Sequence, residues 1–221
     1  MSARRDHISL LFLVVSLFVV PAASQTTSQQ IKTMSSRELL ACLEVKPNCG
    51  VDSYDARGEL TRRRQVSFLI RAYRNSQDDH QQELIVEALF HISDPRVSRF
   101  MHEVGSEWMD KQDWLAWQYL AERGDRKALA MLNQNCGKYG ASSDVWTDTL
   151  VLFGKYRYRP AIPCLIRWVN VMNLTPADAA YASLRILFPG SPDLKSPEDA
   201  ETYFTKRASQ EAASKKKMRQ P

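Results

Sequence analysis

The sequence predicts an all-α fold, a right-handed α-solenoid of stacked antiparallel helical hairpins with capping helices at its N- and C-terminal ends. Three observations lead to this prediction. Apolar residues recur at helical spacing, glycine occurs only eight times in 221 residues, and one leucine position repeats about every 32 residues. No stretch shows the sustained two-residue alternation typical of a half-buried strand. We therefore expect helices joined by short turns, each pair covering the apolar side of the next.

Four segments of the chain have apolar residues along one helical face. They are Val66, Leu69, Ile70 and Tyr73; Leu84, Ile85, Ala88, Leu89 and Ile92; Ala128, Leu129, Leu132 and Cys136; and Ile162, Leu165, Ile166 and Val169. Each set follows the spacing of one side of an α-helix. Each therefore predicts an amphipathic helix whose apolar side is buried against a neighbour.

Short turns with helix-capping residues separate these segments. The pairs Asp94-Pro95, Thr175-Pro176 and Ser196-Pro197 each place a capping side chain before a proline. This arrangement predicts a helix that begins at the proline. Gly124-Asp125 ends one helix and begins the next within two residues. Helices joined so tightly fold back as antiparallel neighbours.

A single position marks the first helix of four successive hairpins. Leu89, Leu120, Leu152 and Leu184 lie at intervals of 31, 32 and 32 residues. One hairpin cannot cover its own apolar stripe. A repeat of this length therefore predicts hairpins stacked side by side.

The segment from Tyr119 to Leu132 resembles a HEAT-like repeat. It contains the end of one helix, a Gly-Asp turn, and a second helix that begins with small and apolar residues. Partial matches are Ser93-Asp94-Pro95-Arg96-Val97 and Arg159-Pro160-Ala161-Ile162-Pro163. The resemblance covers residues 76–190 and implies an extended, curved binding surface. A tetratricopeptide array is the nearest alternative, but its Gly-x-x-Tyr pairing is not repeated in register here.

The first 24 residues are predicted to be a signal peptide. Arg4 and Arg5 precede an apolar run from Ile8 to Val20, and small residues follow before Gln25. The run is too short for a membrane-spanning helix, which needs about 20 apolar residues. A buried hydrophobic helix is the alternative. We therefore expect an exported protein, periplasmic or extracellular, with no transmembrane helix after signal removal.

The remaining boundaries follow from composition and pattern. We expect a flexible lead over 25–33, N-terminal capping helices over 34–75 with a Cys42/Cys49 loop, HEAT-like repeats over 76–190, a C-terminal helix over 191–213 and a basic disordered tail over 214–221. Atypical end units are expected because an end repeat has one side without a neighbour.

The charge balance argues against nucleic-acid binding. The formal net charge is +5, and much of the excess lies in the last sixteen residues, including Lys215, Lys216 and Lys217. The rest of the chain is nearly neutral and lacks the basic face typical of nucleic-acid-binding proteins. The tail is expected to be solvated, with weak contact to an anionic surface as the alternative.

Four cysteines favour disulfides, because an even number in an exported protein is typical of paired thiols. Three connectivities are possible, and we favour Cys42 with Cys49 and Cys136 with Cys164. The chain-entropy estimate is about 2.5 kcal/mol for the first bond and about 3.5 kcal/mol for the second. Cys136 and Cys164 also lie on apolar helical faces, so two buried free thiols are the alternative there.

No catalytic, cofactor-binding or metal-binding residue is predicted. Glu87 and His91 share a helical face and His102 precedes Glu103, but these residues lack the spacing of a zinc-binding motif. Gly105-Ser106 lacks the flanking glycine pattern of a nucleophile elbow. Glycine-rich phosphate-binding loops are absent from the sequence.

The most unusual local feature is the run Lys155, Tyr156, Arg157, Tyr158 and Arg159. Arginine and aromatic residues dominate binding hot spots, although at a turn between helices they also pack with their charges in water. We take these five as candidate partner-binding residues. The predicted function is a non-catalytic scaffold that binds an unidentified protein partner. The alternative is an enzyme or enzyme subunit, such as a lyase accessory protein.

Overall fold

The structure is a computed structural model, and it describes residues 29–44, 49–105, 111–136, 143–170, 174–194 and 196–218. Within these ranges it is all-helical and contains no strand, so the predicted all-α class is confirmed. None of the helices in them has both the length and the apolar character needed to cross a membrane. The helices are α2 (Ser36–Ala41), α3 (Ser53–Arg63), α4 (Val66–Asn75), α5 (Asp79–Phe90), α6 (Pro95–Val104), α7 (Lys111–Glu122), α8 (Arg126–Gln134), α9 (Ser143–Lys155), the 3-10 turn η1 (Arg159–Ala161), α10 (Ile162–Val169), α11 (Leu174–Leu187) and α12 (Pro197–Met218).

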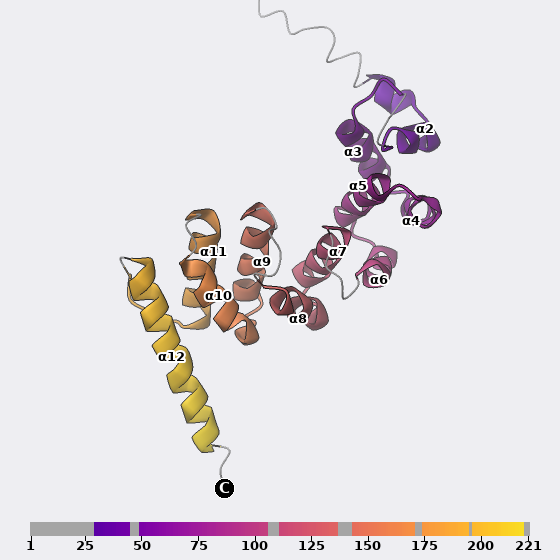
Figure 1. The fold of residues 1–221 in the computed structure, drawn as a ribbon. Coiled ribbons are helices and arrows are strands. Elements are labelled where there is room, and N and C mark those ends of the chain that lie inside the picture. The colour runs from indigo at the N-terminus through magenta and orange to yellow at the C-terminus, as the bar shows by residue number, and fades with distance from the viewer. Residues whose placement is uncertain are drawn as a thin grey trace, which may run out of the picture.

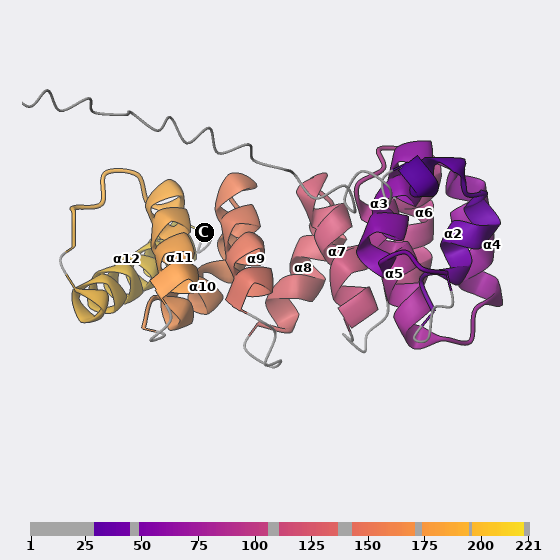
Figure 2. The same cartoon turned by 90° about the horizontal axis from the view of Figure 1, so that it is seen from above.

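The helices follow one another along an arc and form two rows (Figure 1). The inner row contains α3, α5, α7, α9 and α11, and the outer row contains α2, α4, α6, α8, α10 and α12. Each inner helix contacts the next inner helix. Seen from above, α7 to α12 follow one another along the molecule, with α12 at the end far from α2 (Figure 2).

Aspartate side chains begin four of these helices. Asp52, Asp78, Asp94 and Asp125 each accept a hydrogen bond from a backbone N–H of the first turn at 2.8–3.0 Å. Such a side chain satisfies a donor that has no acceptor within the helix. The predicted helix starts at Asp94 and Asp125 are therefore confirmed.

Helix α11 begins earlier than the sequence pattern predicts. The pattern predicts Thr175 as the capping residue and Pro176 as the first helical residue, but the helix already includes Leu174. Proline is tolerated in a first turn because the first backbone N–H groups have no intrahelical acceptor. The pair thus marks the first turn of a helix without fixing its first residue.

The four regularly spaced leucines lie on four successive inner helices. Leu89 belongs to α5, Leu120 to α7, Leu152 to α9 and Leu184 to α11, and at most 5% of the surface of each is exposed. The inner helices therefore turn equivalent positions toward the core.

The first described residues are helical where a flexible lead is predicted. Residues 29–33 form a helical segment in which Ile31 is buried. The Arg63 guanidinium donates to the backbone oxygens of Ile31 and Lys32 at 3.3 and 3.4 Å. The prediction is wrong for 29–33 because it rested on polar composition, whereas tertiary contacts stabilise most short helices.

The last helix also extends beyond its predicted end. Helix α12 begins at Pro197 and continues to Met218, so residues 214–218 are helical and the predicted tail boundary is wrong. Alanine and lysine are good helix formers, and cations near a helix C-terminus interact favourably with its dipole. The first half of α12 is anchored by buried Ala200 and Phe204. The predicted signal peptide, 1–24, lies outside the described residues.

A candidate partner-binding cleft between α7 and α9

An open cleft of about 570 Å³ lies on the inner row of helices. Its walls come from the C-terminal end of α7, from the outward side of α9, and from the turn after α5. The lining residues are Ser93, Glu122, Arg123, Asp148, Val151, Leu152 and Lys155. The cleft therefore combines two acidic side chains, two basic side chains and an exposed apolar one.

The turn at Gly124 positions the α7 wall. Gly124 has a φ of +81°, a left-handed conformation that favours glycine, and a Cβ there would lie 3.1 Å from the Tyr156 ring. The Tyr156 hydroxyl donates a hydrogen bond to the backbone oxygen of Glu122. Tyr156 therefore fixes the end of α7 against the end of α9, which frames the cleft.

Three tryptophan rings hold α9 in place. The Trp146 ring on α9 lies 4.6 Å from the Trp114 ring of α7 and 5.2 Å from the Trp168 ring of α10, between centroids. Trp146 is fully buried. Aromatic pairs contribute about 0.5–1.5 kcal/mol beyond the burial of their area. The cluster thus joins three helices behind the cleft and limits movement of its α9 wall.

The surroundings of the cleft shift the pKa of the Glu122 carboxyl. Burial raises the pKa of the Glu122 carboxyl, and the nearby Asp148 charge raises it further, while Arg123, Lys155 and His91 act in the opposite direction. Asp148 accepts a hydrogen bond from Gln118 Nε2 at 3.3 Å. A carboxylate held in this way gains by pairing with a donor or a cation from outside.

Arg123 is held at the rim of the cleft by its own helix. Its guanidinium lies 3.5 Å from the centroid of the Tyr119 ring and donates to the Tyr119 backbone oxygen at 2.9 Å. Its distance to the Glu122 carboxylate is 3.8 Å. The guanidinium is therefore oriented before any partner arrives, which lowers the entropic cost of a contact with it.

The structure divides the five predicted partner-binding residues by role. Lys155 lines the cleft, and Arg157 is exposed with a φ of 48°. Tyr156 joins α9 to α7, and the Tyr158 ring stacks on Phe153 with centroids 5.9 Å apart. Arg159 donates to the Leu187 backbone oxygen at 3.1 Å and pairs with Glu211. Three of the five thus contribute contacts within the fold, and two face solvent.

The histidine and glutamate residues considered for metal binding contact other side chains. Glu87 pairs with Arg57, and Glu103 pairs with Arg74. His102 Nε2 lies 3.1 Å from a carboxylate oxygen of Asp125. In the part of the chain that the structure describes, no three His, Cys, Asp or Glu side chains gather in the manner of a metal site.

Both favoured disulfides are present. Cys42 pairs with Cys49, with Cα atoms 5.6 Å apart, and Cys136 pairs with Cys164, with Cα atoms 6.0 Å apart. Cys136 follows α8 and Cys164 lies in α10, so the second bond links two outer helices. Arg167 on α10 adds a hydrogen bond to the Cys136 backbone oxygen at 3.2 Å.

Of the seven residues that line the cleft, the sequence predicted only Lys155 as a binding residue, and it missed the other six: Ser93, Glu122, Arg123, Asp148, Val151 and Leu152. One signal was available for Val151, which is an apolar residue outside the stripe formed by Trp146, Leu150 and Phe153 on the same helix. Apolar residues away from a buried stripe are candidates for contacts with a partner.

No protein-family model matches this chain, and no curated protein sequence matches it either.

Proposed function

We propose that this chain is an exported, non-catalytic scaffold similar to HEAT-like repeat proteins, which binds a protein partner in the cleft between α7 and α9. In this proposal the two rows of helices form a right-handed α-solenoid, with α2–α4 and α12 as its ends. The regular burial of one leucine on each of four successive inner helices supports the repeat. The two disulfides support an oxidising compartment, since disulfides persist mainly outside the cytosol.

The exposure of Val151 is the observation that carries the binding site. Among the described residues the exposed large apolar side chains are Tyr54, Val151 and Ile186, and Val151 is the one that lines the cleft. Its exposed fraction is 46%. An apolar residue surrounded by Glu122, Arg123 and Lys155 is complementary to a protein surface that offers an apolar side chain with charges of both signs.

A pair of matched variants tests the cleft. Val151→Asp puts a charge in the cleft, and Ile186→Asp makes the same change on α11, where Ile186 has an almost equal exposed fraction of 47%. The tagged mature chain is used to capture partners from its own host, and each recovered protein is then titrated against both variants. We expect Val151→Asp to weaken the partner about tenfold or more and Ile186→Asp to leave it unchanged. Equal binding by both variants would reject the cleft.

The run from Lys155 to Arg159, predicted to bind a partner at the turn between α9 and η1, is tested separately with Arg157→Ala. Arg159 is not suitable for this test because it binds the Leu187 backbone oxygen and Glu211. Loss of the partner on changing Arg157 alone would extend the binding surface from the cleft to the turn.

Export is tested by the N-terminal sequence of the mature protein. The expected first residue is Gln25, because the small residues before it fit a signal-peptidase site. A protein that retains residues 1–24 inside the cytosol would reject this part of the proposal.

The raised pKa of Glu122 favours a second candidate function, an enzyme. Glu122 is half-buried, and Asp148 lines the same cleft; a carboxyl with a raised pKa near a second carboxylate is a common arrangement for general acid–base catalysis. The test compares wild type with Glu122→Gln on chromogenic ester, peptide and glycoside substrates. Turnover that Glu122→Gln abolishes would replace the scaffold by an enzyme, whereas the scaffold predicts no difference between the two proteins.

A further inference from the structure

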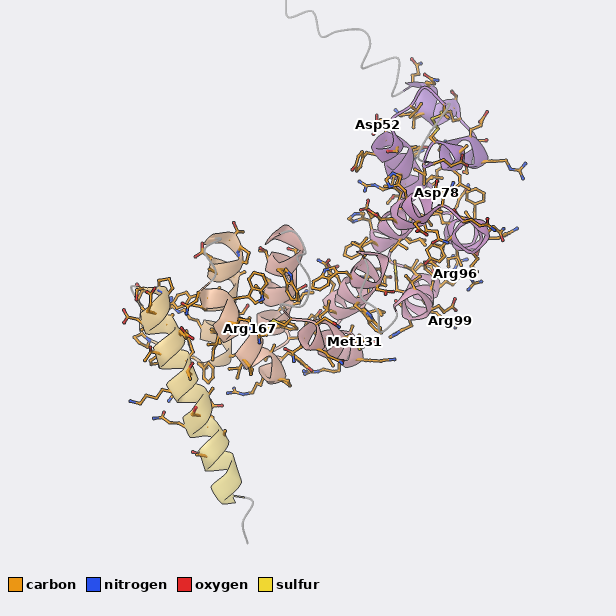
Figure 3. The ribbon with its side chains drawn as sticks, in the orientation of Figure 1. Asp52, Asp78, Arg96, Arg99, Met131 and Arg167 are labelled. Carbon is orange, nitrogen blue, oxygen red and sulfur yellow. A yellow bond between two sulfur atoms is a disulfide. The ribbon has the colours of Figure 1, made fainter. Side chains whose placement is uncertain are left out.

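A second concave surface lies between α4 and α6, on the outer row of helices. It is a groove of about 440 Å³. Four arginines line it, Arg71 and Arg74 from α4 and Arg96 and Arg99 from α6. Figure 3 shows Arg96 and Arg99 on the side of α6 that faces away from the inner row. We call this surface the arginine groove.

Side-chain contacts link the two helices at both ends of the arginine groove. At one end Arg96 donates to the Ser67 hydroxyl at 2.9 Å, and at the other Arg74 donates to the Glu103 carboxylate at 2.5 Å. Both pairs are separated by 29 residues, so α4 and α6 run parallel in matched register. The groove is therefore bounded at two points about two helical turns apart.

The middle of the groove contains positive charge without a counter-ion. Arg96 is neutralised by Asp94 at 2.7 Å, and Arg74 by Glu103. Arg71 and Arg99 are exposed, and neither forms a hydrogen bond or an ion pair with another residue in the described ranges. Two guanidinium groups from neighbouring helices thus line one groove, and an anion between them would relieve their repulsion.

The floor of the groove is apolar. Phe100 is 2% exposed and packs edge-on against the Tyr73 ring, with centroids 5.0 Å apart, and Ile70 lies beside it in the lining. An inorganic anion would leave the half-buried Ile70 side chain in contact with water. A ligand with both a carboxylate and an apolar side chain would use the floor and the two guanidinium groups together.

We propose that the arginine groove binds an acidic peptide segment, with carboxylates on Arg71 and Arg99 and an apolar side chain on Ile70, which is half-buried above Phe100. Guanidinium groups bind carboxylates with two parallel hydrogen bonds, which favours Arg over Lys in such a site. The recessed floor favours a side chain over a flat lipid surface. This site is on different helices from the cleft between α7 and α9, and it does not depend on the function proposed for that cleft.

The test measures binding of a fluorescein-labelled peptide of alternating glutamate and leucine to the full mature chain by fluorescence anisotropy. A glutamine-leucine peptide removes the carboxylates, and a glutamate-serine peptide removes the apolar side chains. We expect saturable binding of the first peptide alone, weakened by added salt. Saturable binding of the glutamine-leucine peptide with equal affinity would contradict the ionic contact, and equal affinity for the glutamate-serine peptide would contradict the apolar one.

A matched pair of double variants locates the site. Arg71→Ala with Arg99→Ala removes the two unpaired arginines of the groove, whereas Arg37→Ala with Arg126→Ala removes two other exposed arginines and the same net charge. We expect a loss of affinity of about tenfold or more in the first and of less than about twofold in the second, because hydrogen bonds to charged groups are stronger than general charge attraction. Thermal melting checks that both variants are folded.

Several outcomes would overturn the proposal. Equal losses of peptide affinity in the two double variants would show that binding depends on the overall net charge and not on the groove. No saturable binding of the glutamate-leucine peptide would remove the peptide site. Binding of phosphatidylglycerol vesicles or of duplex DNA in place of the peptide, lost on changing Arg71 and Arg99, would assign the groove to a different class of ligand.

Discussion

Two pairs of neighbouring helices in this protein are held together in different ways. At the α4–α6 junction, Arg96 donates to Ser67 and Arg74 to Glu103 at the surface, and the Phe100 and Tyr73 rings make an edge-on contact beneath them. At the α9–α11 junction the backbones approach so closely that a Cβ on Gly154 would lie 2.9 Å from Ser183 Cα.

The α9–α11 junction is also sealed from water. The buried Ser183 hydroxyl donates to the Leu150 backbone oxygen at 2.8 Å. A buried hydrogen bond cannot be exchanged for water without cost, whereas exposed ion pairs contribute only about 0–1 kcal/mol. The close junction is therefore suited to holding the fold, and the polar junction leaves side chains available for a ligand.

The largest loss of stability is expected when a buried residue of α9 is replaced. Trp146→Ala removes the ring that joins α7, α9 and α10, and we expect unfolding to become easier by about 3–5 kcal/mol. Tyr54→Ala, which truncates an aromatic side chain that is 63% exposed, should cost less than about 0.5 kcal/mol. Urea unfolding followed by circular dichroism measures both. Similar losses would show that the Trp146 ring is not central to the core.

The disulfides extend the comparison to the N-terminal end of the molecule and to its middle, between α8 and α10. Replacing Cys136 and Cys164 by alanine opens a loop of 28 residues in sequence separation, against 7 for Cys42 and Cys49. The chain-entropy estimate predicts losses of about 3.5 and about 2.5 kcal/mol. Thermal melting of the two double variants, each with and without reductant, measures them. The comparison fails if the Cys42 and Cys49 variant is the less stable of the two.

The buried carboxylate of Glu59, which pairs with Arg62 and Arg63, should matter more than the exposed ion pairs nearby. Hydrogen bonds from Arg62 and Arg63 lower the pKa of Glu59 from 4.5 to about 2, although burial opposes the shift. A lowered pKa means that the stabilisation is complete above pH 4.5 and is lost as the pH falls toward 2. We expect Glu59→Gln to lower the free energy of unfolding by about 2 kcal/mol at pH 7. The difference in this free energy between the variant and wild type should narrow below pH 4.5. If urea unfolding gave the same difference between the variant and wild type below pH 4.5 as at pH 7, the lowered pKa of Glu59 would be contradicted.

The turn that frames the cleft offers a matched pair of glycine variants. Gly124→Ala places a Cβ at a φ of +81° and 3.1 Å from the Tyr156 ring, and we expect a loss of about 1–2 kcal/mol. Gly58→Ala lies in helix α3 with no atom within 4 Å of the new Cβ, and should gain up to about 1 kcal/mol. Differential scanning calorimetry measures the two shifts, which should have opposite signs.

The smallest effect is expected at the α4–α6 junction itself. Arg74 and Glu103 are 59% and 49% exposed, so Arg74→Ala should change stability by less than about 0.5 kcal/mol. The change should vanish in high salt because water and ions screen the pair. If urea unfolding showed that Arg74→Ala lowers the free energy of unfolding by more than about 1 kcal/mol, the surface contacts between α4 and α6 would be important for stability.

Several parts of the fold could be predicted because they depend on residues close in sequence. The apolar stripes predict the helices, Asp94 and Asp125 predict two of their starts, and the even number of cysteines predicts disulfides, of which we favour the pairing that the structure has. The helical segment at residues 29–33 could not be predicted, because Arg63 stabilises it from more than 30 residues away.

The sequence by itself determined the helical class, the order of the helices and the buried side of those helices that carry an apolar stripe, since these follow from side-chain spacing and capping along the chain. Only the tertiary structure decided which exposed side chains meet. Glu122, Asp148 and Lys155 converge in one cleft, and Arg71 and Arg99 in another, because the rotation and offset of neighbouring helices depend on packing between distant residues.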